Sequence, residues 1–327
     1  MRELSELESA IGSALVMVQL RGASPPLIED RFRIERLLGR GSFGLVVGAH
    51  DLLLDRKVAI KCLPSQGSER LFDEVAPEVR ALAALDVPQV AKIYDCKQSR
   101  LHLGPRPIPC VLIVMEWVEG VSLRRWSLGL HTRSEQIEVL VAAAKGLEAA
   151  HAASIIHRDF KPENVVVPAS RVARVVDFGL AFHAGLGPSS ERGLRRQVHV
   201  AGTPEYMAPE VQQGRVSVQS DQFSFAVAAW EVLTGKLPFF DAQRVPDPKA
   251  AEQLPSPLAE TLTRALELQP ERRFESLAQL RSVLEHCEES LWQKHRTLVT
   301  GAVAVGASLA AFALGQESTR RALQRRK

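Results

Sequence analysis

The spacing of apolar residues changes several times along the chain, and each change predicts a different element. Near the N-terminus apolar residues recur every three or four positions, namely at Leu4, Leu7, Ile11, Leu15 and Val18. This period predicts a leader helix that ends before the Gly-Ala-Ser-Pro-Pro break at residues 22–26. We expect the helix to pack on the main domain, with docking of a partner as the alternative role.

The rest of the chain shows a β-rich pattern followed by a helical one. Between Phe32 and Leu63 the runs FRIERLL, LVVGAH and KVAIKCL are separated by glycine-rich and polar turns, which predicts strands. A helical stretch and one more apolar run, at 69–85 and 111–118, complete this part. After Gly120 the expected helices are 134–152, 220–235, 258–268 and 276–291, and the expected short strands are 165–167 and 174–176. The pattern predicts an α+β fold with a β-rich lobe at about 32–118 and a helical lobe at about 119–285.

Composition and charge narrow the class of protein. The 327 residues are 46% apolar and 24% charged, which is typical of soluble globular proteins and excludes a disulfide-dependent miniprotein or a polytopic membrane protein. The net charge is +3, but five bases lie within the last eight residues, namely Arg320, Arg321, Arg325, Arg326 and Lys327. Without them 36 basic residues face 38 acidic ones, so we expect no nucleic-acid partner.

The cysteines and the N-terminus bear on the compartment. Cys62, Cys96, Cys110 and Cys287 show neither CxxC nor zinc-ligand spacing, which predicts reduced thiols. The acidic N-terminus MRELSELESA lacks the basic and apolar regions of a secretory signal. We therefore expect a cytoplasmic domain.

A glycine-rich segment and a lysine point to a phosphate site. Gly39, Gly41 and Gly44, followed by Val46, have the spacing GxGxxGxV between two predicted strands. Glycine lets the backbone approach a phosphate chain closely, although a glycine-rich hairpin without a ligand has the same spacing. In the next strand Lys61 lies among apolar neighbours, where a lysine is costly unless it meets an anion. The two features together favour phosphate binding.

Two further motifs supply groups for phosphoryl transfer. The run His157-Arg-Asp159-Phe-Lys161-Pro-Glu-Asn164 is followed by Asp177-Phe-Gly179. Asp159 can accept the proton of an attacking hydroxyl, while Asn164 and Asp177 offer the hard oxygen ligands that Mg²⁺ prefers. A run ending at Ala208-Pro-Glu210 closes the segment that begins at Asp177.

In order and spacing these motifs resemble those of eukaryotic-type protein kinases, specifically the bacterial Ser/Thr protein kinases, from about Phe32 to about Leu284. The resemblance implies a bilobal protein-kinase-like fold, ATP and Mg²⁺ as cofactors, and a protein substrate with a Ser or Thr acceptor. The implied catalytic groups are Asp159 as base, Lys161 as γ-phosphate contact, and Asn164 and Asp177, which are also the metal ligands. The implied ATP-binding residues are Leu38, Gly39, Arg40, Gly41, Ser42, Phe43, Gly44, Val46, Ala59, Lys61, Glu78, Glu116 and Val118. Met115 matches the gatekeeper, and Asp221 and Arg273 match structural anchors, Arg273 as the partner of Glu210.

The sequence departs from the family pattern in three places. Relatives pair a glutamate of the small-lobe helix with the lysine; Glu78 fits, but the preceding Pro77 predicts a late start or a kink, and Glu74 is the alternative. The segment before the helix near Leu258 has only seventeen residues, so an additional helix that relatives carry there is expected to be reduced or missing. Residues 191–202 contain no hydroxyl, so the usual phosphorylation site of the activation segment is absent.

The C-terminal end carries a separate prediction. Residues 286–296 are expected to form a juxtamembrane helix, 297–315 a candidate transmembrane helix, and 316–327 a basic tail. A single span would anchor the kinase domain to the inner face of the cell membrane; a surface-bound tail and a soluble helix are the alternatives. Ala302, Gly306 and Ala310 form a stripe of small residues suited to self-association of two chains.

The sequence thus predicts a Ser/Thr protein kinase. The competing hypothesis is a pseudokinase that acts as a scaffold or allosteric binding module, since fold alone does not prove catalysis. The intact set of Lys61, Asp159, Asn164 and Asp177 favours the enzyme. A small-molecule kinase of similar fold is a third hypothesis, which the GTPEYMAPE run disfavours.

Overall fold

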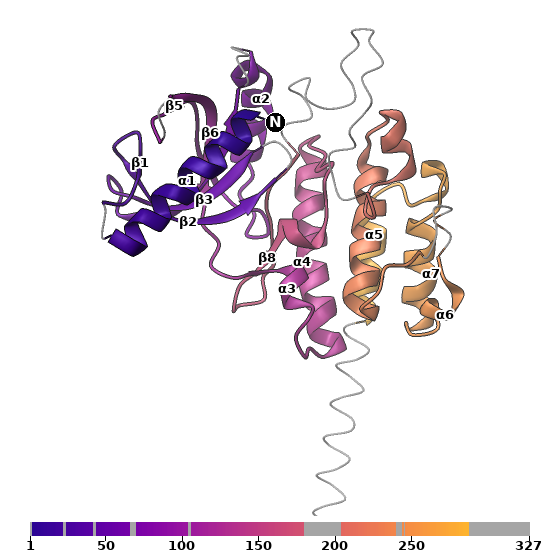
Figure 1. Cartoon of the computed structure of the whole chain (residues 1–327). Coiled ribbons are helices and arrows are strands. Elements are labelled where there is room, and N and C mark those ends of the chain that lie inside the picture. The colour runs from indigo at the N-terminus through magenta and orange to yellow at the C-terminus, as the bar shows by residue number, and fades with distance from the viewer. Residues whose placement is uncertain are drawn as a thin grey trace, which may run out of the picture.

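Antiparallel strands form the first lobe of the structure, a computed structural model that describes residues 2–21, 24–41, 44–65, 70–103, 106–179, 204–239, 244 and 246–287. The sheet has the strand order β1-β2-β3-β4-β6-β5. The strands are β1 (Leu27–Ile28), β2 (Phe32–Arg40), β3 (Leu45–Asp51), β4 (Arg56–Pro64), β5 (Ile93–Leu101) and β6 (Ile108–Glu116). Two helices accompany them, α1 (Arg2–Arg21) and α2 (Leu71–Ala83). Figure 1 shows this lobe beside a second, helical one.

Side chains alternate between two apolar layers along the central strands, because successive residues of a strand point to opposite faces. On β4, Ala59 and Leu63 belong to the core that continues into the second lobe, whereas Ile60 and Cys62 belong to a separate core on the outer face. Helix α1 covers that outer face with Leu4, Leu7 and Ile11, which are at most 7% exposed. The prediction that the leader helix packs on the main domain is therefore confirmed.

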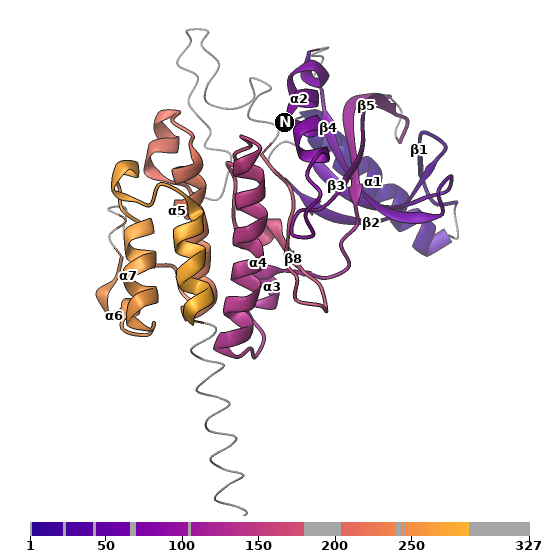
Figure 2. The same cartoon turned by 180° about the vertical axis from the view of Figure 1, so that it is seen from behind.

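The second lobe is built around two long helices, α4 (Arg133–Ala152) and α5 (Val218–Thr234). Helix α4 begins with a capping box between Thr132 and Glu135, and almost all of α5 is buried. Figure 2 shows α4, α5 and α7 side by side. The other helical elements are α3 (Leu123–Trp126), η1 (Pro162–Asn164), η3 (Pro209–Gln213), α6 (Pro248–Ala251), α7 (Ser256–Ala265) and η4 (Pro270–Arg272), and residues 277–287 are also helical. The second lobe also contains a small sheet of β7 (Val121–Ser122), β8 (Val165–Val167) and β9 (Arg174–Val175). The run 157–164 ends where β8 begins, and Asp177 follows β9.

Two expectations about helices meet different outcomes. Helix α2 begins at Leu71 and continues through Pro77, so of the two effects expected of the proline the late start is wrong, while the kink stays a prediction. Pro77 has no N–H to donate, but the helical residues before it and the buried face of α2 keep the helix continuous. The segment in which an additional helix was expected to be reduced or missing contains, in its described part, only the four-residue α6.

The C-terminal segment that is expected to interact with a membrane lies almost entirely outside the described residues. Among the helices that the structure describes, none combines the length and apolar character needed to cross a bilayer. The candidate span 297–315 and the tail 316–327 lie beyond the described part, as does the expected juxtamembrane helix after residue 287.

Candidate active site

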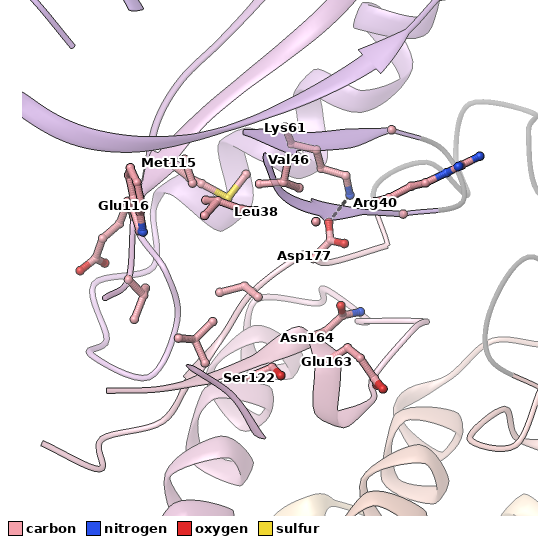
Figure 3. A pocket seen from close by; sticks show the side chains of 18 of the residues that line it. Leu38, Arg40, Val46, Lys61, Met115, Glu116, Ser122, Glu163, Asn164 and Asp177 are labelled. Atoms are coloured by element: carbon pink, nitrogen blue, oxygen red, sulfur yellow. Dashed lines mark hydrogen bonds and ion pairs between the residues drawn. The ribbon is translucent and has the colours of Figure 1, made fainter. Parts of the chain in front are cut away.

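A cleft of about 630 Å³ opens between the two lobes. Its upper wall comes from β2, β3, β4 and the segment after β6, and its lower wall from η1, β8 and the residues around Asp177 (Figure 3). The expected site residues that line it are Leu38, Gly39, Arg40, Gly41, Gly44, Val46, Ala59, Lys61, Glu116, Val118, Asp159, Lys161, Asn164 and Asp177. Of the remaining three, Glu78 does not line the cleft, and Ser42 and Phe43 lie outside the described residues.

The glycine-rich turn joins β2 to β3 and is closed by its own backbone. Gly39 pairs with Val46 across the two strands, and the Gly41 N–H donates to the Gly44 carbonyl oxygen at 2.9 Å. Gly44 approaches β4 so closely that a Cβ there would lie 2.5 Å from the Cys62 carbonyl oxygen. Gly39, in contrast, has no atom within 4 Å of such a Cβ. Close packing therefore requires glycine at position 44 but not at position 39.

Lys61 is a nearly buried cation, and its partner in the structure is Asp177. The side chain of Lys61 is 8% exposed, and its Nζ donates to Asp177 Oδ1 (Figure 3). Burial opposes the ionisation of Asp177, but the charge and hydrogen bond of Lys61 outweigh it and hold the pKa of the carboxyl below its usual value. The carboxyl group of Asp177 is thus ionised at neutral pH.

The expected pairing of Lys61 with a glutamate of α2 is wrong for this structure. Glu78 contacts Arg158 instead, with Nη1 and Oε2 3.2 Å apart, and Glu74 is exposed. The reason lies in the two loops that face α2: Asp177 and Arg158 adopt φ of +58° and +68°, so the loop conformations decide which charges meet. Such left-handed conformations are costly for residues other than glycine and often occur at functional sites.

The loop between α4 and β8 holds the expected base. Lys161 Nζ lies 2.8 Å from Asp159 Oδ2, and Asn164 Nδ2 donates to the Asp159 carbonyl oxygen at 2.8 Å. Buried Asp221 fixes the start of this loop, because its carboxylate accepts the backbone N–H groups of His157 and Arg158 at 2.6 and 2.8 Å. The expectation that Asp221 is a structural anchor is therefore confirmed.

His157 fixes the two motifs against each other. Burial lowers the pKa of its imidazole below the usual value, so the ring is neutral. Its Nε2 lies 3.1 Å from the Val176 carbonyl oxygen, and the Asp159 N–H donates to Nδ1 at 3.4 Å. These contacts place the proton on Nε2 and connect the base loop to the residue before Asp177.

The donor set in the cleft fits a hard divalent cation. Asp177 offers a carboxylate, and Asn164 uses only Nδ2 for its side-chain hydrogen bonds to described residues, which leaves Oδ1 as an oxygen ligand. Mg²⁺ is usually bound through one or two protein oxygens together with substrate phosphates. Asn164 and Asp177 could therefore hold Mg²⁺ beside the phosphates of a nucleotide.

Two residues of the lower wall were missed by the motif analysis. Val166 and Val176 line the cleft and are apolar enough to contact a planar ring. Val166 could have been found from strand alternation, because its neighbours Val165 and Val167 are buried in the core and Val166 must point the other way. No comparable pattern identifies Val176.

A buried ion pair closes the second lobe, as expected. Nη1 and Nη2 of Arg273 donate to the two carboxylate oxygens of Glu210 at 2.6 and 2.9 Å, and both side chains are at most 3% exposed. This bidentate geometry anchors the end of the segment that begins at Asp177. Most of that segment, residues 180–203, lies outside the described residues, including Thr203 and the stretch without hydroxyls.

Comparisons with known proteins agree with this geometry. Residues 32–291 match the family model of the protein kinase domain. The chain is 33% identical over 278 residues to the serine/threonine-protein kinase PknB of Mycobacterium tuberculosis, covering 80% of this chain and 43% of PknB. It is 32% identical over 286 residues to the serine/threonine-protein kinase Pkn1 of Myxococcus xanthus, covering 80% and 39%. The chain spans less than half the length of these curated relatives. Its fold is similar to the crystal structure of the Mycobacterium tuberculosis PknI kinase domain, with a TM-score of 0.59 and 22% identity over 81% of this chain and 98% of that one.

Proposed function

The chain belongs to the protein kinase family, and we propose that it transfers the γ-phosphoryl group of ATP to Ser or Thr hydroxyls of protein substrates. The observation that carries the proposal is that Lys61, Asp159, Lys161, Asn164 and Asp177 line one cleft. These groups come from three separate parts of the chain, namely β4, the segment before β8 and the segment after β9. A phosphoryl transfer needs all of them within reach of one nucleotide.

In the proposed complex the upper wall holds the nucleotide. Val46 and Ala59 contact the adenine ring from above, and the backbone of Glu116 and Val118 offers it hydrogen bonds. Lys61 is the cation nearest the phosphates, and the glycine-rich turn brings backbone N–H groups to them. Mg²⁺, when bound at Asn164 and Asp177, neutralises charge on the phosphates.

Transfer then depends on Asp159 and Lys161. The carboxylate of Asp159 accepts the proton of the acceptor hydroxyl as the oxygen attacks the γ-phosphorus, and the bond to the leaving ADP oxygen breaks. Lys161, 2.8 Å from Asp159 Oδ2, lies where its charge can stabilise the transferring phosphoryl group. Asn164 orients the base loop through the Asp159 carbonyl oxygen. Positioning and charge, rather than covalent chemistry on the protein, account for the acceleration.

Replacement of the base tests the proposal. Asp159→Asn should lower transfer to a generic protein such as casein by at least about 100-fold, in the range that general-base catalysis contributes. Its affinity for ATP should stay within about threefold, because Asp159 is placed at the acceptor side of the cleft. Lys61→Met should instead weaken ATP binding. Wild-type protein that binds ATP with Mg²⁺ but labels neither itself nor any protein would favour the scaffold hypothesis.

A further inference from the structure

An ion pair links the leader helix to the glycine-rich turn. Glu8 of α1 contacts Arg40, the last residue of β2, with Oε2 and Nη1 2.6 Å apart. Among the described residues Glu8 is the only ion-pair partner of Arg40. Helix α1 precedes the region that matches the family model, which begins at residue 32, so this contact joins a helix outside the matched region to a residue inside it.

The apolar face of α1 fixes the position of Glu8. Leu7 and Ile11, on either side of Glu8 in the sequence, are fully buried in the outer core of the sheet, and Leu4 is 7% exposed. Cys62 and Ile60 of β4 belong to the same core, so the helix is packed on the strand that carries Lys61. The backbone of Glu8 is therefore held rigidly before its side chain makes any contact.

Arg40 connects helix α1 to the glycine-rich turn at the edge of the cleft. Gly39 and Gly41 flank it, all three residues line the cleft, and Arg40 pairs with Leu45 across the turn. In Figure 3 the side chain of Arg40 extends away from Lys61 and Asp177. Glycines on both sides leave the turn with high conformational entropy, which binding of a nucleotide must remove.

We propose that Glu8 is a positioning residue that holds the glycine-rich turn through Arg40 and so increases the affinity of the cleft for ATP. An anchor that limits the freedom of the turn beforehand reduces the entropy lost on binding, which is the general effect of preorganisation. The inference rests on the proposed function, because it takes ATP as the ligand of the cleft.

The solvent exposure of Glu8 and Arg40 limits how much their ion pair can change the affinity for ATP. The side chains of Arg40 and Glu8 are 55% and 32% exposed, so solvent screens their attraction. Exposed pairs contribute little, and we expect Glu8→Gln to raise the dissociation constant and the KM for ATP about two- to fivefold. The kcat at saturating ATP should change less than twofold, because Glu8 contacts no reacting group.

A double-mutant cycle on the full chain separates positioning from general damage. Glu8→Gln, Arg40→Gln and the double variant are compared for ATP affinity by calorimetry and for KM and kcat. If Glu8 acts through Arg40, adding Glu8→Gln to Arg40→Gln has no further effect. Asp86→Asn is the matched control, because it removes another exposed ion pair of the same lobe, with Lys92 at 2.9 Å, that does not involve the turn. It should leave the KM for ATP unchanged.

Hydrogen–deuterium exchange gives a readout that needs no nucleotide. Backbone amides of the β2–β3 segment should exchange faster in Glu8→Gln than in the wild type or in Asp86→Asn. An unchanged or lowered KM in Glu8→Gln, or an equal loss in the Arg40→Gln background, overturns the inference. A wild-type protein that does not bind ATP overturns the proposed function instead, and the exchange rates then still decide whether Glu8 holds the turn.

Discussion

Gly39 and Gly44 belong to the same glycine-rich motif but differ in the space that a Cβ atom would have. A Cβ at Gly44 would lie 2.5 Å from the Cys62 carbonyl oxygen and 2.8 Å from a methyl group of Leu63, whereas Gly39 is open. We predict that Gly44→Ala destabilises the fold by about 1–3 kcal/mol, the usual cost of overpacking, because backbone of β4 has to move. Gly39→Ala should stay within about 1 kcal/mol of the wild type. Denaturant titration of both variants measures the difference, and equal losses would refute the steric argument.

The buried imidazole of His157 predicts a pH dependence of stability. Its pKa is lowered in the folded protein, so between that value and the ordinary value near 6.5 the unfolded chain binds a proton that the folded one does not. The free energy of unfolding should therefore fall as the pH drops below about 6.5, with a slope of at most about 1.4 kcal/mol per pH unit from this group. His157→Gln keeps a hydrogen-bonding side chain but does not titrate. Denaturation curves between pH 7.5 and 5.5 should show a shallower slope for this variant, and identical slopes would contradict the assignment.

The sequence predicted correctly which residues meet in the cleft where these residues lie close together in the chain. Asp159, Lys161 and Asn164 lie on one short loop, so their convergence in the cleft follows from their distance in the chain. The partner of Lys61 could not be predicted in the same way. It depends on the left-handed backbone of Asp177 and Arg158, which no local pattern in the sequence indicates.

At the scale of elements, α2 contains a proline that the helix tolerates at a cost. Pro77 is exposed in the middle of Leu71–Ala83, where it removes one backbone hydrogen bond. We predict that Pro77→Ala raises the free energy of unfolding by about 1–2 kcal/mol, less than the full helix-interior cost because proline also restricts the unfolded chain.

A second proline of the chain is the control for this prediction. Pro257 lies in the first turn of α7 and is also exposed, and proline fits that position because its missing N–H would have no partner there. Pro257→Ala should therefore bring no gain in stability. Urea midpoints measure both variants, and a gain as large for Pro257→Ala as for Pro77→Ala would show that the position of the proline in the helix does not matter.

The elements that sequence pattern predicted best are those with a strong period. The run of β6 is apolar from Ile108 to Met115, and that of β4 is apolar from Val58 to Leu63 except at Lys61. Such runs are typical of strands covered on both faces, and α1 supplies one of the two covers. A late start of α2, one of the two effects expected of Pro77, did not occur, because the burial of Leu71, Val75, Val79 and Leu82 on one face outweighs the propensity of one proline. Tertiary packing decided this boundary.

At the scale of the whole molecule, the order of the two lobes could be predicted from the sequence. The hydrophobic pattern predicted a small β-rich lobe followed by a helical one, and the glycine-rich turn and the 157–164 run then assigned one wall of the cleft to each lobe. No motif in the sequence indicated the contact of Glu8 with Arg40, because it joins a helix outside the matched kinase domain to a residue between two glycines. Contacts between a domain and its extension depend on packing that the motif does not encode.

The C-terminal sequence carries the last prediction, which concerns residues outside the described part. Thr297–Gly315 contains nineteen uncharged residues, which as a helix would measure about 28 Å against a hydrocarbon core of about 30 Å. Two features oppose insertion: half of the residues from Leu298 to Gly315 are Ala or Gly, and five basic residues would have to cross while only Lys294 and Arg296 stay inside. In favour of insertion, the small residues Ala302, Gly306 and Ala310 form a stripe that suits close pairing of two helices in the bilayer.

We predict a single membrane span, and fractionation of cells tests it. The full-length chain should stay with membranes through high-salt and carbonate washing, because an inserted helix is not held by charge. A truncation after Arg296 should be soluble and retain kinase activity, since all the described residues that line the cleft precede it. Release of the full chain by salt alone would indicate a surface-bound tail, whose basic residues are screened as the ionic strength rises. Recovery of the full chain in the soluble fraction would reject membrane association, and the two kinase domains would then have no shared bilayer in which to pair.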